Sequence, residues 1–280
     1  MGNTPHIDPP FGTYALPAER ENTRAAANGH SATRIGTWQI SLARKRAIKG
    51  LSEPFDVDVA DGVRARLYPS TNRCEKRALC GVQIWDPVER GALKEAIAKP
   101  SDAPFVFLDV GANVGLYSLF ASAYAQTSGR DIRIIAVEPS SEMVKRLTVN
   151  AQASEAEIEL IRSAVATEAG DVFLSDGGGN RGEGQLADRG ESVMAMTMLQ
   201  LCKTIGITRI DALKLDIEGL DLAVLTQFFE QAHEPLHPEL MILELDETSG
   251  GPLIELAQAH DYLITERTHM NVVVRKQDRT

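Results

Sequence analysis

The stretch FVFLDVGANVGLYSLF, residues 105–120, decides the fold. A short apolar run ends at Asp109, Gly111 and Gly115 follow in a turn, and a helical pattern of apolar residues begins at Leu116. A tight strand-to-helix turn takes glycine where φ is positive or where backbone must approach a ligand, and a helix N-terminus offers unpaired N–H groups to an anion. The stretch therefore predicts a strand, a ligand-binding turn and a helix.

From Pro104 onward, short β-rich apolar runs alternate with helical stretches. This alternation is typical of an α/β fold whose parallel sheet is connected by crossover helices. The last two runs, 262–267 and 271–275, are separated by only a short turn and predict an antiparallel hairpin. The other expected strands are 105–109, 132–137, 157–162, 211–216 and 240–245, and the expected helices are 114–127, 140–152, 219–232 and 251–260.

The residues before this pattern divide into two parts. Residues 1–33 are rich in Pro, Asn, Gly and polar residues without a period, so we expect an irregular or disordered N-terminal arm. Residues 34–103 form an N-terminal cap with a helix at 87–98, and residues 104–280 form the ligand-binding domain. The basic stretch 34–49 is the solvated face of a helix, or a contact for an acidic substrate or a membrane surface.

Charge and composition narrow the partners and the compartment. A net charge of -10 opposes a nucleic-acid partner, because such binding rests on Lys and Arg neutralising phosphates. No apolar run approaches the roughly 20 residues that a membrane helix needs, so no integral membrane segment is expected. The first residues lack a secretory pattern, and the 3 cysteines lack CxxC spacing, which indicates reduced thiols and a cytoplasmic location.

Two acids beside the turn bear on the ligand. A buried Asp109 would repel a pyrophosphate but suits a ligand with an ammonium group and a sulfonium, as in S-adenosylmethionine. The dinucleotide fingerprint G-x-G-x-x-G is incomplete, because Asn113 stands at its second glycine. Glu138, after the second strand, is placed to accept hydrogen bonds from both hydroxyls of an adenosine ribose. The alternative is that Asp109 and Glu138 merely cap strand ends.

Three blocks of the sequence, DVGANVG (109–115), VEP (137–139) and KLDIEG (214–219), resemble the FkbM family of S-adenosylmethionine-dependent methyltransferases. The resemblance covers about residues 104–246. It implies a Rossmann-like class I methyltransferase fold, with seven mostly parallel strands in the order 3-2-1-4-5-7-6 and the seventh antiparallel.

Transferred to this chain, the resemblance also implies a binding site for S-adenosyl-L-methionine as cofactor. Its methionine end would be lined by Asp109, Gly111, Asn113 and Gly115, its ribose held by Glu138, and its adenine edge met by Ser163 and Ala164. The chain departs from the family in 196–200, which lacks the usual carboxylate, and at Asp221, where the family has Glu.

Three carboxylates fall at the carboxyl ends of strands, where an open α/β sheet binds its ligand. Asp216, Glu218 and Glu244 are therefore expected to face the methyl acceptor. We expect Asp216 to be the general base or the group that orients the acceptor, with a pKa raised by partial burial. Lys214 lies two residues earlier on the same strand face and could pair with Asp216, while Glu218 could simply complement a helix dipole.

No histidine accompanies these carboxylates at ligand spacing, so no metal site is predicted. His269, near the hairpin, is a reserve base. The glycine-rich segment Asp176–Gly190 lies between two expected strands and is either a lid or acceptor-binding element, or an excursion without a role.

The predicted activity, suggested by the resemblance, is O-methylation of a hydroxyl on a sugar, glycan or other small metabolite. N-methylation stays open. The alternatives are an NAD-type oxidoreductase and a catalytically silent, methyltransferase-like binding module. The oligomeric state has no signature in the sequence.

Overall fold

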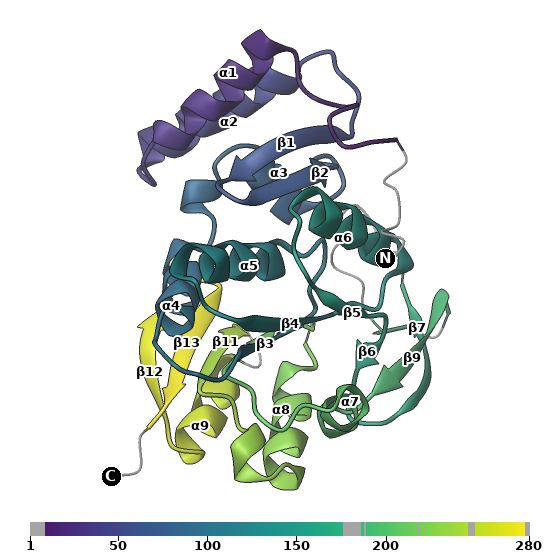
Figure 1. Ribbon diagram of the computed structural model, residues 1–280. Coiled ribbons are helices and arrows are strands. Elements are labelled where there is room, and N and C mark those ends of the chain that lie inside the picture. Colours follow the sequence, from purple (N-terminus) through teal and green to yellow (C-terminus); the bar gives the residue numbers. More distant parts are fainter. Residues whose placement is uncertain (1–8, 176–185, 188, 218, 246–249, 278–280) are drawn as a thin grey trace.

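A central sheet of seven strands organises the chain (Figure 1). The computed structural model describes residues 9–175, 186–187, 189–217, 219–245 and 250–277. The sheet order is β12-β13-β11-β10-β3-β4-β5. Its strands are β3 (Phe105–Val110), β4 (Ile132–Val137), β5 (Glu159–Ile161), β10 (Ala212–Leu215), β11 (Leu240–Glu244), β12 (Tyr262–Arg267) and β13 (Asn271–Lys276).

The order of the strands agrees with the topology expected from the sequence. Numbered along the chain within this sheet, the order is 3-2-1-4-5-7-6, as predicted. β3, β4, β5, β10 and β11 are parallel, whereas β13 is antiparallel to β11 and to β12. The predicted fold class and the C-terminal hairpin are confirmed.

Alternation along each strand buries both faces of the sheet. Phe107, Ile134 and Ile242 belong to one hydrophobic cluster, whereas their neighbours Leu108 and Leu243 belong to another. The first face is covered by α4 (Pro87–Ile97), α5 (Leu116–Ser128) and α6 (Ser141–Ala153), and the second by α7 (Met198–Ile205), α8 (Asp221–Gln231) and α9 (Gly250–Ala259) (Figure 1).

Local signals explain where the helices begin. Ser140 accepts a hydrogen bond from the backbone N–H of Met143 and so starts α6, and Thr197 forms a capping box with Gln200 at the start of α7. The helix expected from residue 219 begins only at Asp221, because Gly219 has φ +89°, outside the helical region.

The N-terminal segment is more ordered than its composition indicated. It contains α1 (Ala18–Ala26), the 3-10 helix Ala27–Gly29, α2 (Arg34–Ile48), the hairpin β1 (Phe55–Ala60) and β2 (Val63–Leu67), α3 (Arg73–Leu79) and the 3-10 helix Val82–Ile84. The prediction of an irregular arm is therefore wrong for α1. Its buried contact is made by Arg24, which pairs with Glu21 and donates to the carbonyls of Asp58 and Leu79.

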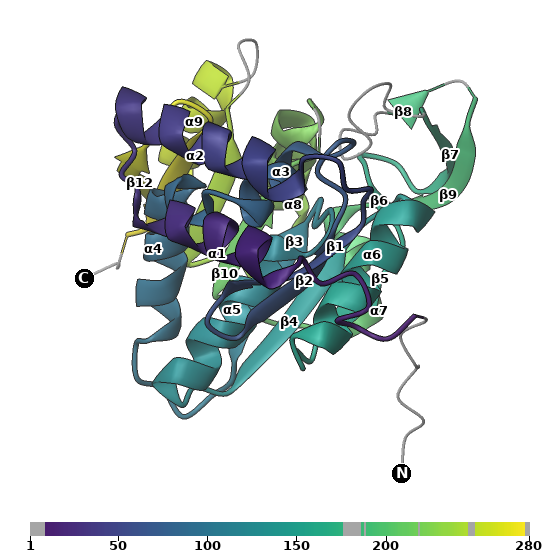
Figure 2. The same cartoon turned by 90° about the horizontal axis from the view of Figure 1, so that it is seen from above.

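The N-terminal hairpin shares its core with the sheet. Helices α1 and α2 lie side by side over the hairpin (Figure 2), and Val63 and Leu67 of β2 fall in the same hydrophobic cluster as Phe107 and Phe120. Gly62 has φ +74°, and a Cβ there would lie 3.2 Å from the Cβ of Ala123 in α5. One continuous core therefore crosses the predicted boundary at 103/104.

A second, small sheet stands beside β5, with strands β6 (Ala164–Val165), β7 (Gly170–Leu174), β8 (Leu186–Ala187) and β9 (Glu191–Met196) in the order β6-β9-β7-β8. Strands β7 and β9 flank the glycine-rich segment 176–190, as predicted. Most of that segment lies outside the described residues. Within the part of the chain that is described, no helix is long and apolar enough to span a bilayer.

Candidate functional site

A cavity of about 870 Å³ opens at the carboxyl ends of β3, β4, β10 and β11, and α2 and α3 form its outer wall. This volume is in the range of small-molecule sites, about 300–1,000 Å³. Nine residues predicted from the sequence line it together: Asp109, Gly111, Asn113, Glu138, Ser163, Ala164, Lys214, Asp216 and Glu244. Glu218 lies outside the described residues.

The glycine turn joins β3 to α5 at the floor of the cavity. The N–H groups of Gly111 and Ala112 both donate to the carbonyl of Val137, at 2.9 and 3.0 Å, which ties the turn to β4. Gly111 has φ +80°, and a Cβ there would lie 1.8 Å from the carbonyl oxygen of Asp216. No other residue type fits this position, because both its dihedral angle and its space exclude a side chain.

Gly115 was expected to line the methionine end of the cofactor site, but it lies behind the turn. It begins α5 with φ +84°, and a Cβ there would lie 2.7 Å from Cγ of Leu147 in α6. It is not among the residues that line the cavity. The glycine is required by helix packing, and the sequence motif alone does not distinguish this from a ligand contact.

Asp109 presents an unpaired oxygen at the base of the site. Its Oδ2 accepts a 2.6 Å hydrogen bond from the hydroxyl of Ser118, while its buried Oδ1 has no hydrogen-bond partner among the described residues. Burial raises the pKa of this carboxyl above its ordinary value. A buried acceptor without a donor is costly, so it suits a ligand that supplies an N–H or a positive charge.

Glu138 is held rigidly by backbone donors. The N–H of Asn113 lies 2.8 Å from its Oε2, and the N–H of Ser140 lies 2.9 Å from its Oε1. Burial nevertheless raises its pKa to about 7. A carboxylate has about four acceptor positions, so two remain for hydroxyl donors. This geometry fits a ribose diol.

Ser163 has two carbonyl neighbours: its Oγ lies 2.8 Å from the carbonyl of Ala164 and 2.9 Å from that of Met194. Its single proton therefore goes to one of these carbonyls. Together with the backbone of Ala164 it borders the end of the cavity nearest the small sheet.

The buried Lys214 and the partly exposed Asp216 form an ion pair at the end of β10. Lys214 Nζ lies 2.7 Å from Asp216 Oδ2 and 5.1 Å from the ring centre of Tyr117. Burial alone would lower the pKa of Lys214, but the charges of Asp216 and Asp109 raise it. Lys214 therefore stays cationic.

The same pair decides the state of Asp216. Burial would raise its pKa, but the charge and hydrogen bond of Lys214, and a side-chain hydrogen bond with Glu244, hold it below its ordinary value. The predicted pairing with Lys214 is confirmed, and the prediction of a raised pKa is wrong because the cation outweighs burial. With 34% of its side chain exposed, Asp216 is an ionised carboxylate that a ligand can reach.

The N-terminal segment contributes residues that the sequence did not single out. Asn72 donates to Oδ1 of Asn113 over 2.8 Å, and the hydroxyl of Tyr117 lies 3.1 Å from Oδ2 of Asp86. Asp86 has φ +43°, and burial raises its pKa. No motif marks these positions. The only signal was the basic stretch 34–49, one of whose residues, Arg44, lines the cavity.

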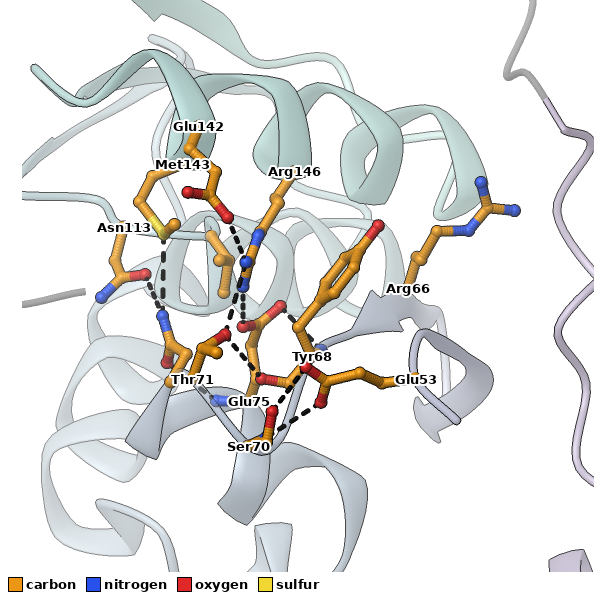
Figure 3. A network of polar contacts seen from close by, with 12 residues as sticks. Glu53, Arg66, Tyr68, Ser70, Thr71, Glu75, Asn113, Glu142, Met143 and Arg146 are labelled. Carbon is orange, nitrogen blue, oxygen red and sulfur yellow. Dashed lines mark hydrogen bonds and ion pairs between the residues drawn. The ribbon is translucent and has the colours of Figure 1, made fainter. Parts of the chain in front are cut away.

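A buried ion pair fixes the α3 wall of the cavity (Figure 3). Arg146 of α6 lies 2.5 Å from Glu75 of α3 and also pairs with Glu142, and its guanidinium lies 4.1 Å from the ring centre of Tyr68. Burial raises the pKa of Glu75 to about 7, although the Arg146 charge opposes this. The pair anchors α3 beside the glycine turn.

The sequence pattern of the Methyltransferase FkbM domain matches residues 109–267, more than half of the 280 residues. The chain belongs to the FkbM methyltransferase family. The match contains the glycine turn, Glu138 and the Lys214–Asp216 pair, and it begins after α2 and α3. The enzyme is a methyltransferase that uses S-adenosylmethionine, and the unpaired Asp109 oxygen, the Gly111 turn and the Glu138 carboxylate fit that cofactor.

Several solved methyltransferase structures are similar to the chain at low identity. The FkbM enzyme is similar to an S-adenosylmethionine-dependent methyltransferase from Agrobacterium tumefaciens (14% identity, TM-score 0.48, 82% of this chain and 72% of that chain). It is also similar to the METTL16 methyltransferase domain (12% identity, TM-score 0.48, 79% of this chain and 75% of that chain). A third similar structure is M. capricolum TrmK in complex with S-adenosylhomocysteine (16% identity, TM-score 0.37, 66% of this chain and 68% of that chain). No curated protein matches the sequence.

Proposed function

We propose that this FkbM methyltransferase methylates a hydroxyl oxygen of a sugar, a glycan or another small metabolite. The observation that carries the proposal is the ionised Asp216, partly exposed in a cavity of about 870 Å³. A carboxylate accepts a hydrogen bond from a hydroxyl and orients one of its lone pairs. Holding the two reactants in the correct orientation supplies much of the rate acceleration in an enzyme-catalysed displacement.

The cofactor residues divide by the chemistry of their partners. Asp109 would accept from the ammonium group, the Gly111 turn would let backbone approach the methionine end, and Glu138 would accept from the ribose hydroxyls. Asn113 holds Glu138 in place through its backbone N–H. Ser163 and Ala164 would border the adenine, and Gly115 supports the turn through its packing against Leu147. When bound, the cofactor supplies a methyl group already activated by a sulfonium.

The acceptor's proton goes to Asp216. With the cofactor bound, the acceptor oxygen would form a bond to its methyl carbon while the carbon–sulfur bond broke, and the electron pair of that bond would stay on sulfur. Positive charge develops on the oxygen, so the hydroxyl proton becomes acidic enough for a carboxylate of low pKa to accept it. Lys214 keeps Asp216 ionised until that moment, and Glu244 holds the carboxylate by a side-chain hydrogen bond. We retain Glu218 as a further candidate on its sequence position alone.

The net charge and the free cysteines bear on the acceptor class and on the cellular location. The net charge of -10 favours a small acceptor over nucleic acid. The thiols of Cys74, Cys80 and Cys202 are free, which accords with action in the cytoplasm. We keep the division into an arm (1–33), a cap (34–103) and a cofactor domain (104–280) as a proposal. Family membership opposes the NAD-type oxidoreductase.

The test compares cofactor binding with turnover. Labelled S-adenosylmethionine is offered with panels of sugars, other alcohols, amines and RNA, while binding of S-adenosylhomocysteine is measured by calorimetry. Asp216→Asn should bind the product within about twofold and lose about 100-fold or more in kcat/KM, the usual effect of a general base. Glu159→Gln, an exposed carboxylate of β5, serves as the control and should leave both unchanged.

Three outcomes would overturn the proposal. An amine or RNA preferred over every alcohol would exclude hydroxyl methylation of a small molecule. Full activity of Asp216→Asn would remove the residue from the mechanism. Cofactor binding without turnover across the whole panel would favour the silent binding module.

A further inference from the structure

The outer wall of the cavity is basic, although the protein as a whole is acidic. Arg44 of α2 and Arg73, Lys76 and Arg77 of α3 line it, whereas the acids that line it lie on the sheet side or at Asp86. Helices α2 and α3 come from the segment before the family match. These cations are therefore not explained by the cofactor residues already described.

Two of these arginines lack a carboxylate partner among the described residues. Among the described residues, the side-chain hydrogen bond of Arg44 goes to the hydroxyl of Ser41, at 3.5 Å. Arg77 makes neither an ion pair nor a side-chain hydrogen bond in that part of the chain. Arginines elsewhere behave differently: Arg66 pairs with Asp56 at 2.7 Å and Arg146 with Glu75 at 2.5 Å.

The two unpaired arginines lie close enough to repel. Burial lowers the pKa of Arg44 below its ordinary value, and the charge of Arg77 acts in the same direction. The charge of Arg77 also acts on Asp86, whose Oδ2 already accepts a hydrogen bond from the Tyr117 hydroxyl. Two guanidinium groups at a cavity wall favour the binding of an anionic ligand. Each planar guanidinium can donate two parallel hydrogen bonds to the oxygens of a phosphate or a carboxylate.

Cys74 places this arginine pair relative to the reaction. It lies one helical turn before Arg77 on α3 and also lines the cavity. Burial, followed by the charge of Asp216, raises the pKa of its thiol to about 12, and the charges of Lys214 and Arg77 oppose this. The thiol is thus within electrostatic reach of both groups. Arg44, Arg77 and Asp216 line the same cavity of about 870 Å³, so one acceptor bound in it can contact the arginines and Asp216.

We propose that the acceptor carries a phosphate or carboxylate group, which Arg44 and Arg77 bind while the hydroxyl to be methylated lies at Asp216. This inference rests on the proposed function for the hydroxyl, but the anion site itself does not require turnover. It makes α2 and α3 the elements that select the acceptor.

Anion binding is tested without catalysis. Inorganic phosphate, and acetate in parallel, are titrated into the protein saturated with S-adenosylhomocysteine. Phosphate should bind the wild type, and Arg44→Gln and Arg77→Gln should each weaken it about 10- to 100-fold, the usual worth of a charged hydrogen bond. Lys45→Gln, an exposed cation beside Arg44 that does not line the cavity, is the control and should bind as the wild type does.

Turnover then separates the two proposals. Glucose, glucose 6-phosphate and glucuronic acid are compared as acceptors, and preference for either charged sugar, lost in Arg77→Gln but not in Lys45→Gln, supports the anion site and names its source. If phosphate binds as expected but no alcohol is methylated, the anion site stands and the proposed activity fails. If neutral sugars are methylated equally well and neither arginine variant differs from the wild type, the anion site is refuted. Preference for an RNA oligonucleotide would refute a small anionic acceptor.

Discussion

Glu138 should make cofactor binding depend on pH around neutrality. Burial raises its pKa from 4.5 to about 7 in the free protein. Hydroxyl donors of the ribose favour the ionised carboxylate, so binding must release the proton. With a pKa near 7, the ionised fraction falls about tenfold between pH 8 and pH 6, which weakens the affinity by about 1.4 kcal/mol.

The same group also affects folding stability. The unfolded chain releases the Glu138 proton near pH 4.5 and the folded chain near pH 7, so the folded state binds the extra proton between these values. The resulting stability is present below pH 4.5 and is lost as the pH rises through 7. Over this range it amounts to about 3 kcal/mol.

Calorimetry with S-adenosylhomocysteine at pH 6, 7 and 8 measures the binding effect, and buffers of different ionisation enthalpy report the proton released. Glu138→Gln is the reference, because it removes this titration but keeps those of Glu75 and Asp221, whose pKa values are about 7 and about 6. Gln cannot accept from both backbone N–H groups, so the variant should also bind more weakly at pH 8 and unfold more easily, by about 1–3 kcal/mol. A wild-type affinity that stays flat from pH 6 to pH 8, without proton release, would refute this account of Glu138.

Three further substitutions test the framework. Gly111→Ala should abolish cofactor binding and destabilise the fold, since its Cβ would meet the Asp216 carbonyl at 1.8 Å, whereas Gly206→Ala, with φ +66° and open space, should cost only about 1 kcal/mol in thermal unfolding. Equal losses in the two would contradict the steric argument. Arg146→Met should lower the urea unfolding free energy by about 3–5 kcal/mol, because it leaves Glu75 buried without its partner; an effect below 1 kcal/mol would remove the pair as the anchor of α3. Lys214→Met should raise the pKa of Asp216, so the acidic limb of the kcat/KM profile should move to higher pH; an unmoved limb would show that Asp216 does not govern it.

Much of the sheet could be predicted because its signals are local. Residues 105–108 are apolar on both faces of the strand, as expected for a strand that helices cover on both sides. The short turn before Asn271 indicated the antiparallel end of the sheet. In contrast, α1 is held by the buried charged side chain of Arg24, which hydrophobic periodicity does not report.

The site divides in the same way. The glycine turn and Glu138 lie within a few residues of strand ends, so their meeting follows from the order of the strands. The pKa of Asp216 could not be predicted, because it depends on which of two opposed effects, burial or Lys214, is larger. Arg77 was missed, and Arg44 was indicated only as part of the basic stretch 34–49, because only tertiary packing brings α2 and α3 to the cavity.

The position of α2 and α3 outside the family match has an evolutionary consequence. Asp216 and the methyl-donor residues lie in the matched stretch 109–267, whereas the arginines proposed to bind the acceptor's anionic group lie earlier, within 37–86. Substitutions in the earlier stretch can therefore change the acceptor specificity while the residues that bind the methyl donor are conserved. Swapping this stretch between relatives would be the natural way to exchange their acceptors.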